Sequence, residues 1–200
     1  MKNVRLNMKN AVIMIVILTL ICGVIYPLIV TGISQLFFKD KANGSIISVD
    51  GVNYGCELLA QEYEGSQYLW GRIMIPNTDT YKDNDGNALY YAGPSNLSPA
   101  SDDFEQLIAE RVEKLQLLNP DATVDKVPVD LVTCSGSGLD PEISVNAAQY
   151  QIARIAKSRE LTEEEVEAII EKYTTHKLFG ILGEETVNVL KVNLALDGII

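Results

Sequence analysis

Apolar residues form one unbroken block near the N-terminus, whereas in the rest of the chain they recur at helix-like or strand-like intervals. Residues 10–38 contain no charged side chain. Because a helix rises about 1.5 Å per residue, about 20 residues cross a bilayer core of about 30 Å. We therefore predict a single transmembrane helix, with its outer interface, over residues 11–38.

A cleaved signal peptide is the main alternative for this block. Signal peptides have an apolar core of about 7–15 residues followed by a small-x-small cleavage site. The block here is longer, and no Ala-x-Ala pattern follows it. Cys22 suggests a lipoprotein, but the bulky Ile21 precedes it where lipid attachment usually needs a small residue. The pattern favours a retained anchor.

Charge sets the expected orientation. Lys2, Arg5 and Lys9 precede the span without an acid among them, and short basic flanks stay in the cytoplasm. We expect residues 1–10 to be cytoplasmic and residues 39–200 to lie outside the cell membrane. The 13 basic residues after the span face 27 acidic ones, a net charge of −14. This acidity argues against nucleic acid as a partner, because its phosphates would be repelled.

Small residues and one proline interrupt the span. They are Thr19, Gly23, Pro27, Thr31 and Gly32. Small residues let membrane helices approach closely, and Pro27 lacks a backbone donor, so we expect helix packing here and a kink near residues 23–27. No ionisable residue lies in the span. A transport role would therefore need partner subunits.

The order of expected strands and helices in residues 39–200 predicts one extracytoplasmic domain of the α+β, or irregular α/β, class. Asp-Gly between two short β-branched runs predicts a hairpin over residues 45–54. Residues 76–99 are polar and rich in turns, which predicts a long ordered loop. Residues 127–134, VPVDLVTC, predict a buried strand, and residues 187–196 fit a short helix better than a strand.

Capping residues mark the helix starts. Asp102 with Glu105 predicts a helix that ends at Pro120. Ser144 is placed to cap a second helix. Thr162, three residues before a glutamate, predicts a capping box ahead of a third helix.

The sharpest local motif is Ser135-Gly136-Ser137-Gly138-Leu139-Asp140-Pro141. Backbone amides of a glycine-rich turn can bind an anion, but the GxxxxGK[ST] pattern of nucleotide-binding loops is missing. The alternative is a tight turn in which glycine supplies a positive φ. A serine nucleophile would need an oriented base, and the only histidine, His176, is distant in sequence. We assign no catalytic residue.

Other polar residues carry weaker signals. Gly71-Arg72 presents a guanidinium group suited either to binding an anion or to holding a loop. Asp79, Asp83 and Asp85 are spaced like part of a calcium loop, but the closing glutamate is missing.

The three cysteines are Cys22, Cys56 and Cys134. They do not have the spacing of a zinc site, and we assign no metal. Cys56 and Cys134 could pair in an oxidising compartment, which the sequence leaves open.

Several short sequence strings, taken in order along the chain, resemble the C subunit of the high-affinity potassium-transporting P-type ATPase. The matching strings are Tyr26-Pro27-Leu28, Thr31-Gly32, Gln35, residues 42–47, residues 55–63, Gly71-Arg72, Gly93 with Ser95-Asn96-Leu97, residues 132–144 and residues 183–197. Departures are Cys56, Ala60, Ile73-Met74-Ile75, Pro94 and Glu142, the last standing where the family usually has histidine. They leave the span and the residue 135–141 turn intact.

The resemblance implies an accessory, non-catalytic subunit of an ATP-driven potassium uptake complex, which helps to assemble and stabilise it. Its implied partners are a potassium-binding channel-like subunit, the P-type ATPase catalytic subunit and a small fourth peptide. ATP and potassium would act at the level of the complex, and this chain has no DKTGT phosphorylation string. The family is also described as assisting ATP binding, for which Gln149 and Gln151 are the candidates.

A second class of function makes a different prediction. A membrane-anchored external enzyme or ligand-binding module using residues 135–140 would keep its activity or ligand when cut from the anchor. An accessory subunit would be inert in isolation. As a refinement of the accessory role, an acidic external surface would raise the potassium concentration near the pump entrance.

Overall fold

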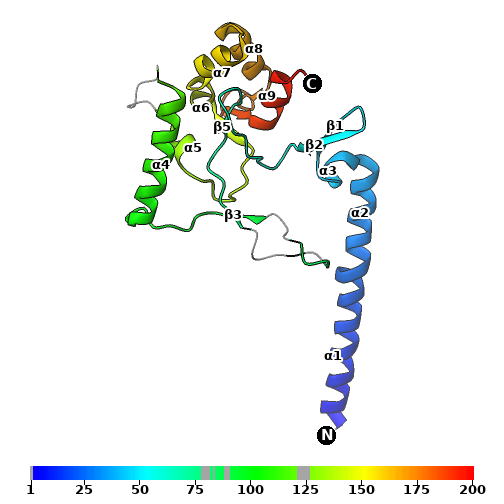
Figure 1. Cartoon of the computed structure of the whole chain (residues 1–200). Coiled ribbons are helices and arrows are strands. Elements are labelled where there is room, and N and C mark those ends of the chain that lie inside the picture. The colour runs from blue at the N-terminus through cyan, green and yellow to red at the C-terminus, as the bar shows by residue number, and fades with distance from the viewer. Residues whose placement is uncertain (1, 78–81, 83, 88–90, 121–126) are drawn as a thin grey trace. The chain divides into compact units, whose positions relative to one another are not determined.

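The computed structural model describes the whole chain except residues 1, 78–81, 83, 88–90 and 121–126. The chain divides into two compact units, residues 1–46 and residues 47–200, which are described separately (Figure 1). The first unit is a long apolar helix with a short helical extension. The second is a domain of helices and small sheets, as the sequence predicts.

The first unit consists of α1 (Lys2–Leu20), a π-helical turn (Ile21–Ile25), α2 (Tyr26–Phe37) and α3 (Lys39–Ala42). Its residues Leu6–Phe37 are long and apolar enough to cross a membrane once, with a mean hydropathy of 2.9 and none of the window buried by the rest of the chain.

The π-helical turn overlaps residues 23–27, where Pro27 predicts a kink. Proline has no N–H group to donate to the carbonyl of Gly23, one turn earlier. In the turn itself the Tyr26 N–H donates to the carbonyl of Ile21, five residues back. The α-helical hydrogen-bonding pattern is therefore replaced by a π-helical one in the turn that precedes the proline.

The second unit is built from short elements. Its strands are β1 (Ile46–Val49), which begins at the unit boundary, β2 (Val52–Cys56), β3 (Pro76–Asn77), β4 (Tyr91–Ala92), β5 (Glu142–Ser144), β6 (Thr174–Thr175) and β7 (Thr186–Asn188). Its helices are α4 (Asp102–Leu118), α5 (Val129–Val132), α6 (Val145–Gln149), α7 (Ile152–Arg159), α8 (Glu163–Lys172) and α9 (Val189–Leu196).

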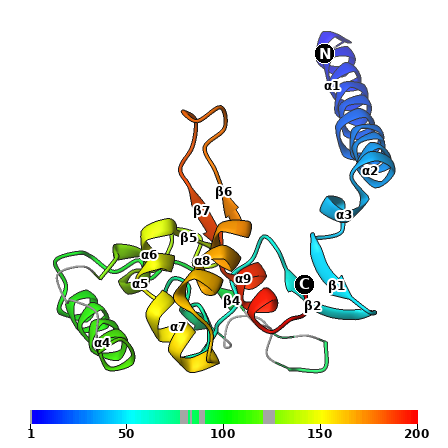
Figure 2. The ribbon, with the colours of Figure 1, turned by 90° about the horizontal axis from the view of Figure 1, so that it is seen from above.

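One small antiparallel sheet organises the C-terminal half. Its strand order is β5-β7-β6, with Ile143 of β5 and Thr174 of β6 both opposite Val187 of the central strand. Helices α6 and α9 contact the sheet, and α8 packs against both α7 and α9 (Figure 2). Ile143 and Val187 are almost wholly buried, so the core lies between the sheet and these helices.

An irregular segment, residues 65–71, passes through this core. Leu69 and Trp70 are only 0% and 2% exposed. A buried backbone that joins neither helix nor sheet still needs hydrogen-bond partners. In this segment, side chains from elements far away in sequence provide them.

Two side-chain amides bind both backbone polar groups of consecutive residues. Asn193 accepts from the Leu69 N–H at 2.8 Å and donates to its carbonyl at 2.9 Å. Gln151 accepts from the Trp70 N–H at 2.9 Å and donates to its carbonyl at 3.0 Å. Each amide therefore takes the place of a neighbouring strand. We call this arrangement the amide clamp.

Arginines bind most of the remaining carbonyls of the segment. Arg154 donates to those of Gly65, Ser66 and Tyr68, Arg159 to that of Gln67, and Arg111 to that of Gly71. The guanidinium groups of Arg111 and Arg154 also lie 4.7 Å and 5.6 Å from the centre of the Trp70 ring. Burial, reinforced by the charge of Arg111, lowers the pKa of Arg154 to about 10.

The capping signals are largely confirmed. The Ser144 hydroxyl accepts from the Ala147 N–H, and Thr162 and Glu165 form the predicted capping box. The cap of α4 is Ser101 rather than Asp102, because the Ser101 hydroxyl accepts from an N–H three residues on. The hairpin predicted over residues 45–54 is also present, as β1 and β2.

The buried strand predicted over residues 127–134 is wrong. Within them, Val129–Val132 form the short helix α5 with Pro128 as its N-cap residue, and Cys134 forms only an isolated bridge with Ile73. Val129 is exposed, whereas Asp130, Leu131 and Val132 are buried together, a pattern that alternation does not produce. A short apolar run does not distinguish a strand from a buried helical turn.

Two other expectations are right in part. Residues 187–196 are helical only from Val189, because Val187 and Asn188 belong to β7. The Asn188 side chain caps α9 by accepting from the Lys191 N–H. The loop predicted over residues 76–99 contains the paired strands β3 and β4, and several of its residues lie outside the described part of the chain.

The amide clamp predicts a large difference between two neighbouring glutamines. Gln151→Ala leaves the N–H and carbonyl of Trp70 buried without partners, and should lower the free energy of unfolding by about 2–5 kcal/mol. Gln149→Ala, at an exposed position, should change it by less than about 0.5 kcal/mol. Denaturant unfolding of the full chain in detergent, followed by tryptophan fluorescence, measures both. Equal effects would show that the clamp is not needed for stability.

Candidate functional site

The turn at residues 135–141 packs closely against the loop that follows β4. Gly138 is buried with φ +71°, and a Cβ atom added to it would lie 2.3 Å from the Gly93 carbonyl oxygen. Only glycine fits such a close approach of two backbones. The second glycine of the turn, Gly136, has open space around it.

Three backbone N–H groups of the turn are already bound within it. The Gly138 N–H donates to the Ser135 carbonyl, and the Leu139 N–H donates to the Ser137 hydroxyl. The Asp140 N–H donates to the Ser135 hydroxyl at 3.4 Å. An anion cradle would direct such groups outward. The geometry therefore favours a tight structural turn over an anion site.

Arg72 joins this turn to the helices around it. Its Nη2 lies 3.0 Å from Asp130 Oδ1, and its Nε lies 3.2 Å from Asp140 Oδ2. The second contact has the distance of an ion pair but not the alignment of a hydrogen bond. Asp130 also accepts from the Ser144 N–H at 2.8 Å. Gly71-Arg72, α5, the turn and the start of α6 thus meet at one guanidinium group.

The pKa of Asp130 is set by opposing effects. Burial raises it, but the hydrogen bonds from Ser144 and the charge of Arg72 outweigh burial, so the pKa lies below its usual value. The carboxylate is therefore charged at neutral pH and works as a structural partner rather than a proton donor.

The loop at residues 93–97 reaches the turn through Cys134. The Ser95 N–H donates to the Cys134 sulfur at 3.4 Å. Asn96 is exposed and has φ +52°. Cys134 is a free thiol in this structure, so it does not form a disulfide with Cys56.

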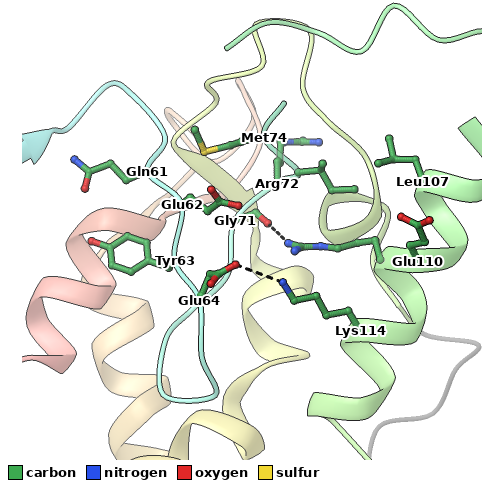
Figure 3. A pocket seen from close by; sticks show the side chains of 12 residues that line it. Gln61, Glu62, Tyr63, Glu64, Gly71, Arg72, Met74, Leu107, Glu110 and Lys114 are labelled. Carbon is green, nitrogen blue, oxygen red and sulfur yellow. Dashed lines mark hydrogen bonds and ion pairs between the residues drawn. The ribbon is translucent and has the colours of Figure 1, made fainter. Parts of the chain in front are cut away.

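A pocket of about 210 Å³ opens between α4 and the chain on both sides of residues 65–71 (Figure 3). Its charged lining consists of Glu62, Glu64, Glu110, Arg72, Arg111 and Lys114. Lys114 pairs with Glu64 at 3.7 Å, and Arg111 donates to the Gly71 carbonyl. Because acids and bases are balanced and partly paired, the lining selects neither an anion nor a cation.

The remaining candidates are placed apart from this cluster. Within the described residues, no group of His, Cys, Asp or Glu side chains is arranged to hold a metal ion, and Asp79 and Asp83 lie outside them. His176 pairs with Glu171 at 3.3 Å and with Glu185 at 3.1 Å, rather than with a serine of the turn. Among the residues that the structure describes, His176 is therefore not the base of a serine nucleophile in this turn.

Comparison with known proteins identifies the family. Residues 8–198 match the family described as KdpC, the K+-transporting ATPase c chain. The chain belongs to this family. It is 56% identical over 200 residues to the potassium-transporting ATPase KdpC subunit of Clostridium botulinum, covering 100% of both chains. It is 54% identical over 192 residues to that of Clostridium perfringens and 40% identical over 203 residues to that of Clostridioides difficile, covering at least 96% of each chain.

Family membership makes this chain a component of a potassium-transporting ATPase. The resemblance drawn from the sequence is thereby confirmed. The cluster around Arg72 brings together three of the sequence strings that carried this resemblance. They are the Gly-Arg pair, the residue 93–97 loop and the residue 135–141 turn.

The two glutamines that are candidates for assisting ATP binding have different environments in this KdpC-family chain. Gln151 is wholly buried, and its amide is engaged in the clamp on Trp70. Gln149, at the end of α6, is exposed. Only Gln149 is therefore available to a molecule approaching from solvent.

The small residues of the span are not packed against other parts of the chain that the structure describes. Thr19, Gly23, Pro27, Thr31 and Gly32 are all exposed. A Cβ atom added to Gly32 would meet nothing within 4 Å, and one added to Gly23 would meet only Thr19, at 3.9 Å. These positions remain candidates for packing against another helix.

Sequence reasoning missed Asp130 as the partner of Arg72. The signal was present, since an aspartate interrupts the apolar run VPVDLVTC and a buried carboxylate needs a partner. It was hidden by the strand interpretation of that run. Asn193 gave a similar signal, because it lies among the apolar residues of α9.

The contact with Gly93 predicts unequal roles for the two glycines of the turn. Gly138→Ala forces a Cβ atom into a backbone carbonyl in a left-handed conformation, and should lower the free energy of unfolding by about 2–4 kcal/mol. Gly136→Ala, made in the same turn, should change it by less than about 0.5 kcal/mol. Denaturant unfolding of the full chain compares them. A neutral Gly138→Ala would mean that the two loops do not touch.

The ion pairs of His176 predict a pH dependence. The hydrogen bond to Glu185 and the charge of Glu171 raise the pKa of His176 above its ordinary value of about 6.5. Because the folded pKa is raised, the stabilisation is fully present below the unfolded pKa and is lost as pH rises through the folded pKa. NMR titration of the imidazole should give a pKa above that of an unfolded peptide, and Glu185→Gln should lower it. An unchanged pKa in that variant would contradict the pairing.

Proposed function

We propose that this chain is the accessory, non-catalytic subunit that assembles and stabilises an ATP-driven, high-affinity potassium uptake complex in the cell membrane. The observation that carries the proposal is the family match over nearly the whole chain, joined to the exposed apolar helix of residues 6–37. Such a helix needs lipid or other membrane helices around it.

The proposed partners are a channel-like potassium-binding subunit, the P-type ATPase catalytic subunit and a small fourth peptide. Gly23 and Gly32 support helix packing in the membrane, because glycine lets a second helix approach its backbone. The turn around Arg72 supports a non-catalytic role, since its polar groups bind one another.

The proposed orientation places residues 1–10 in the cytoplasm and residues 39–200 on the other side of the membrane. Lys2, Arg5 and Lys9 support it, together with the net charge of −14 after the span. In this orientation the domain and cytoplasmic ATP lie on opposite sides of the bilayer. Assistance with ATP binding would then act through the catalytic subunit, and potassium would bind to a partner.

Omitting this chain tests the proposal. We expect that the other pump subunits, expressed without it and extracted in mild detergent, dissociate and lose potassium-stimulated ATP hydrolysis by more than tenfold. Adding back the full chain, or its Gln149→Ala variant, should restore both. A stable complex with full hydrolysis in the absence of this chain would refute the accessory role. Failure of Gln149→Ala alone would instead favour a nucleotide-linked role for that side chain.

A further inference from the structure

The hairpin that joins β6 to β7 ends in an exposed apolar tip. Leu178, Phe179, Ile181 and Leu182 are 60%, 84%, 79% and 56% exposed. We call residues 176–185 the finger, and Figure 2 shows it in orange, projecting beyond the helices of the domain. Single exposed apolar residues are common on protein surfaces, but four neighbouring ones indicate a binding surface.

The tip is ordered by its own backbone. Leu178 and Leu182 exchange two hydrogen bonds, with N···O distances of 2.8 Å and 3.0 Å, and the Gly180 N–H donates to the Lys177 carbonyl. Phe179 has φ +55°, a conformation that a bulky residue adopts only where its surroundings impose it. The large side chains are therefore displayed on a preformed loop, which lowers the entropic cost of binding.

Ion pairs surround the stem below this tip. Lys177 pairs with Glu184 at 3.1 Å, and His176 pairs with Glu171 and Glu185. An apolar centre inside a polar rim is the usual arrangement of a protein–protein interface. Three carboxylates against one lysine and one histidine give this rim an acidic character.

We propose that the finger docks into an apolar socket with a basic rim on another protein subunit of the potassium pump. This inference rests on the proposed function, which supplies partner subunits. Charge decides between the possible occupants. The acidic rim, on a domain of net charge −14, would be repelled by anionic lipid headgroups. In a symmetric contact between two copies of this chain, the same carboxylates would face one another.

Photo-crosslinking tests which molecule covers the tip. A photoreactive amino acid is placed at Phe179 of the full chain, co-expressed with the other pump subunits, and the membranes are irradiated. We expect a crosslink to a pump subunit, and none from the same group at Glu167, an exposed position on α8. A crosslink to lipid only, a crosslink between two copies of this chain, or no crosslink in an assembled complex would overturn the inference.

Substitution of the tip provides a second test. The double variant Phe179→Ser, Ile181→Ser should retain at least tenfold less of the other subunits after detergent extraction, as expected for central interface residues. Its thermal midpoint should match that of the unmodified chain, since these side chains are not part of the core. Leu117→Ser, which alters a similarly exposed residue on α4, is the control.

The outcomes separate this inference from the proposed function. If the unmodified chain co-purifies with no pump subunit, both are overturned. If the unmodified chain assembles and the double variant assembles equally well, only the docking of the finger is overturned. If the variant alone fails to assemble while the Leu117→Ser control assembles, the inference is supported.

Discussion

The fold depends on hydrogen bonds from distant side chains to one irregular backbone segment, residues 65–71. Arg111 comes from α4, Gln151 and Arg154 from the region of α7, and Asn193 from α9, yet all four bind this segment. Helices far apart in sequence are therefore held in place by the same stretch of backbone. Removing Gln151 or Asn193 would leave a buried peptide group without a partner, which is costly in an interior of low dielectric constant.

The same segment leads directly into the cluster that contains the family motifs. Arg72 directly follows residues 65–71 in the sequence, and it pairs with Asp130 and Asp140. The position of the residue 135–141 turn therefore follows from the path of residues 65–71 through the core. In this turn Gly138 is explained by its approach to Gly93, with no ligand required. A short motif that identifies a family can thus mark a junction in the fold rather than a binding site.

Local signals were readable from the sequence, whereas long-range ones were not. The span, the Ser144 cap and the Thr162 capping box depend on residues within one or two turns of each other, so pattern and spacing reveal them. The clamp joins residues 81 and 124 positions apart. Gln and Asn are usually exposed, so nothing in the local pattern distinguishes the buried Gln151 from the exposed Gln149. The helix α5 was missed for a related reason, because Asp130 is explained only by its distant partner Arg72.

Polar and apolar side chains are distributed differently in this chain. In the described residues, the buried side chains of Gln151, Arg154 and Asn193 bind backbone groups or another side chain, and no group of His, Cys, Asp or Glu is arranged to hold a metal ion. Large apolar side chains, by contrast, remain uncovered both along residues 6–37 and at the tip of the finger. Apolar surface left in water costs about 25 cal/mol per Å², so such surfaces are maintained where something else covers them. Lipid and membrane helices can cover the first, but an acidic, preformed loop requires a protein surface shaped to receive it.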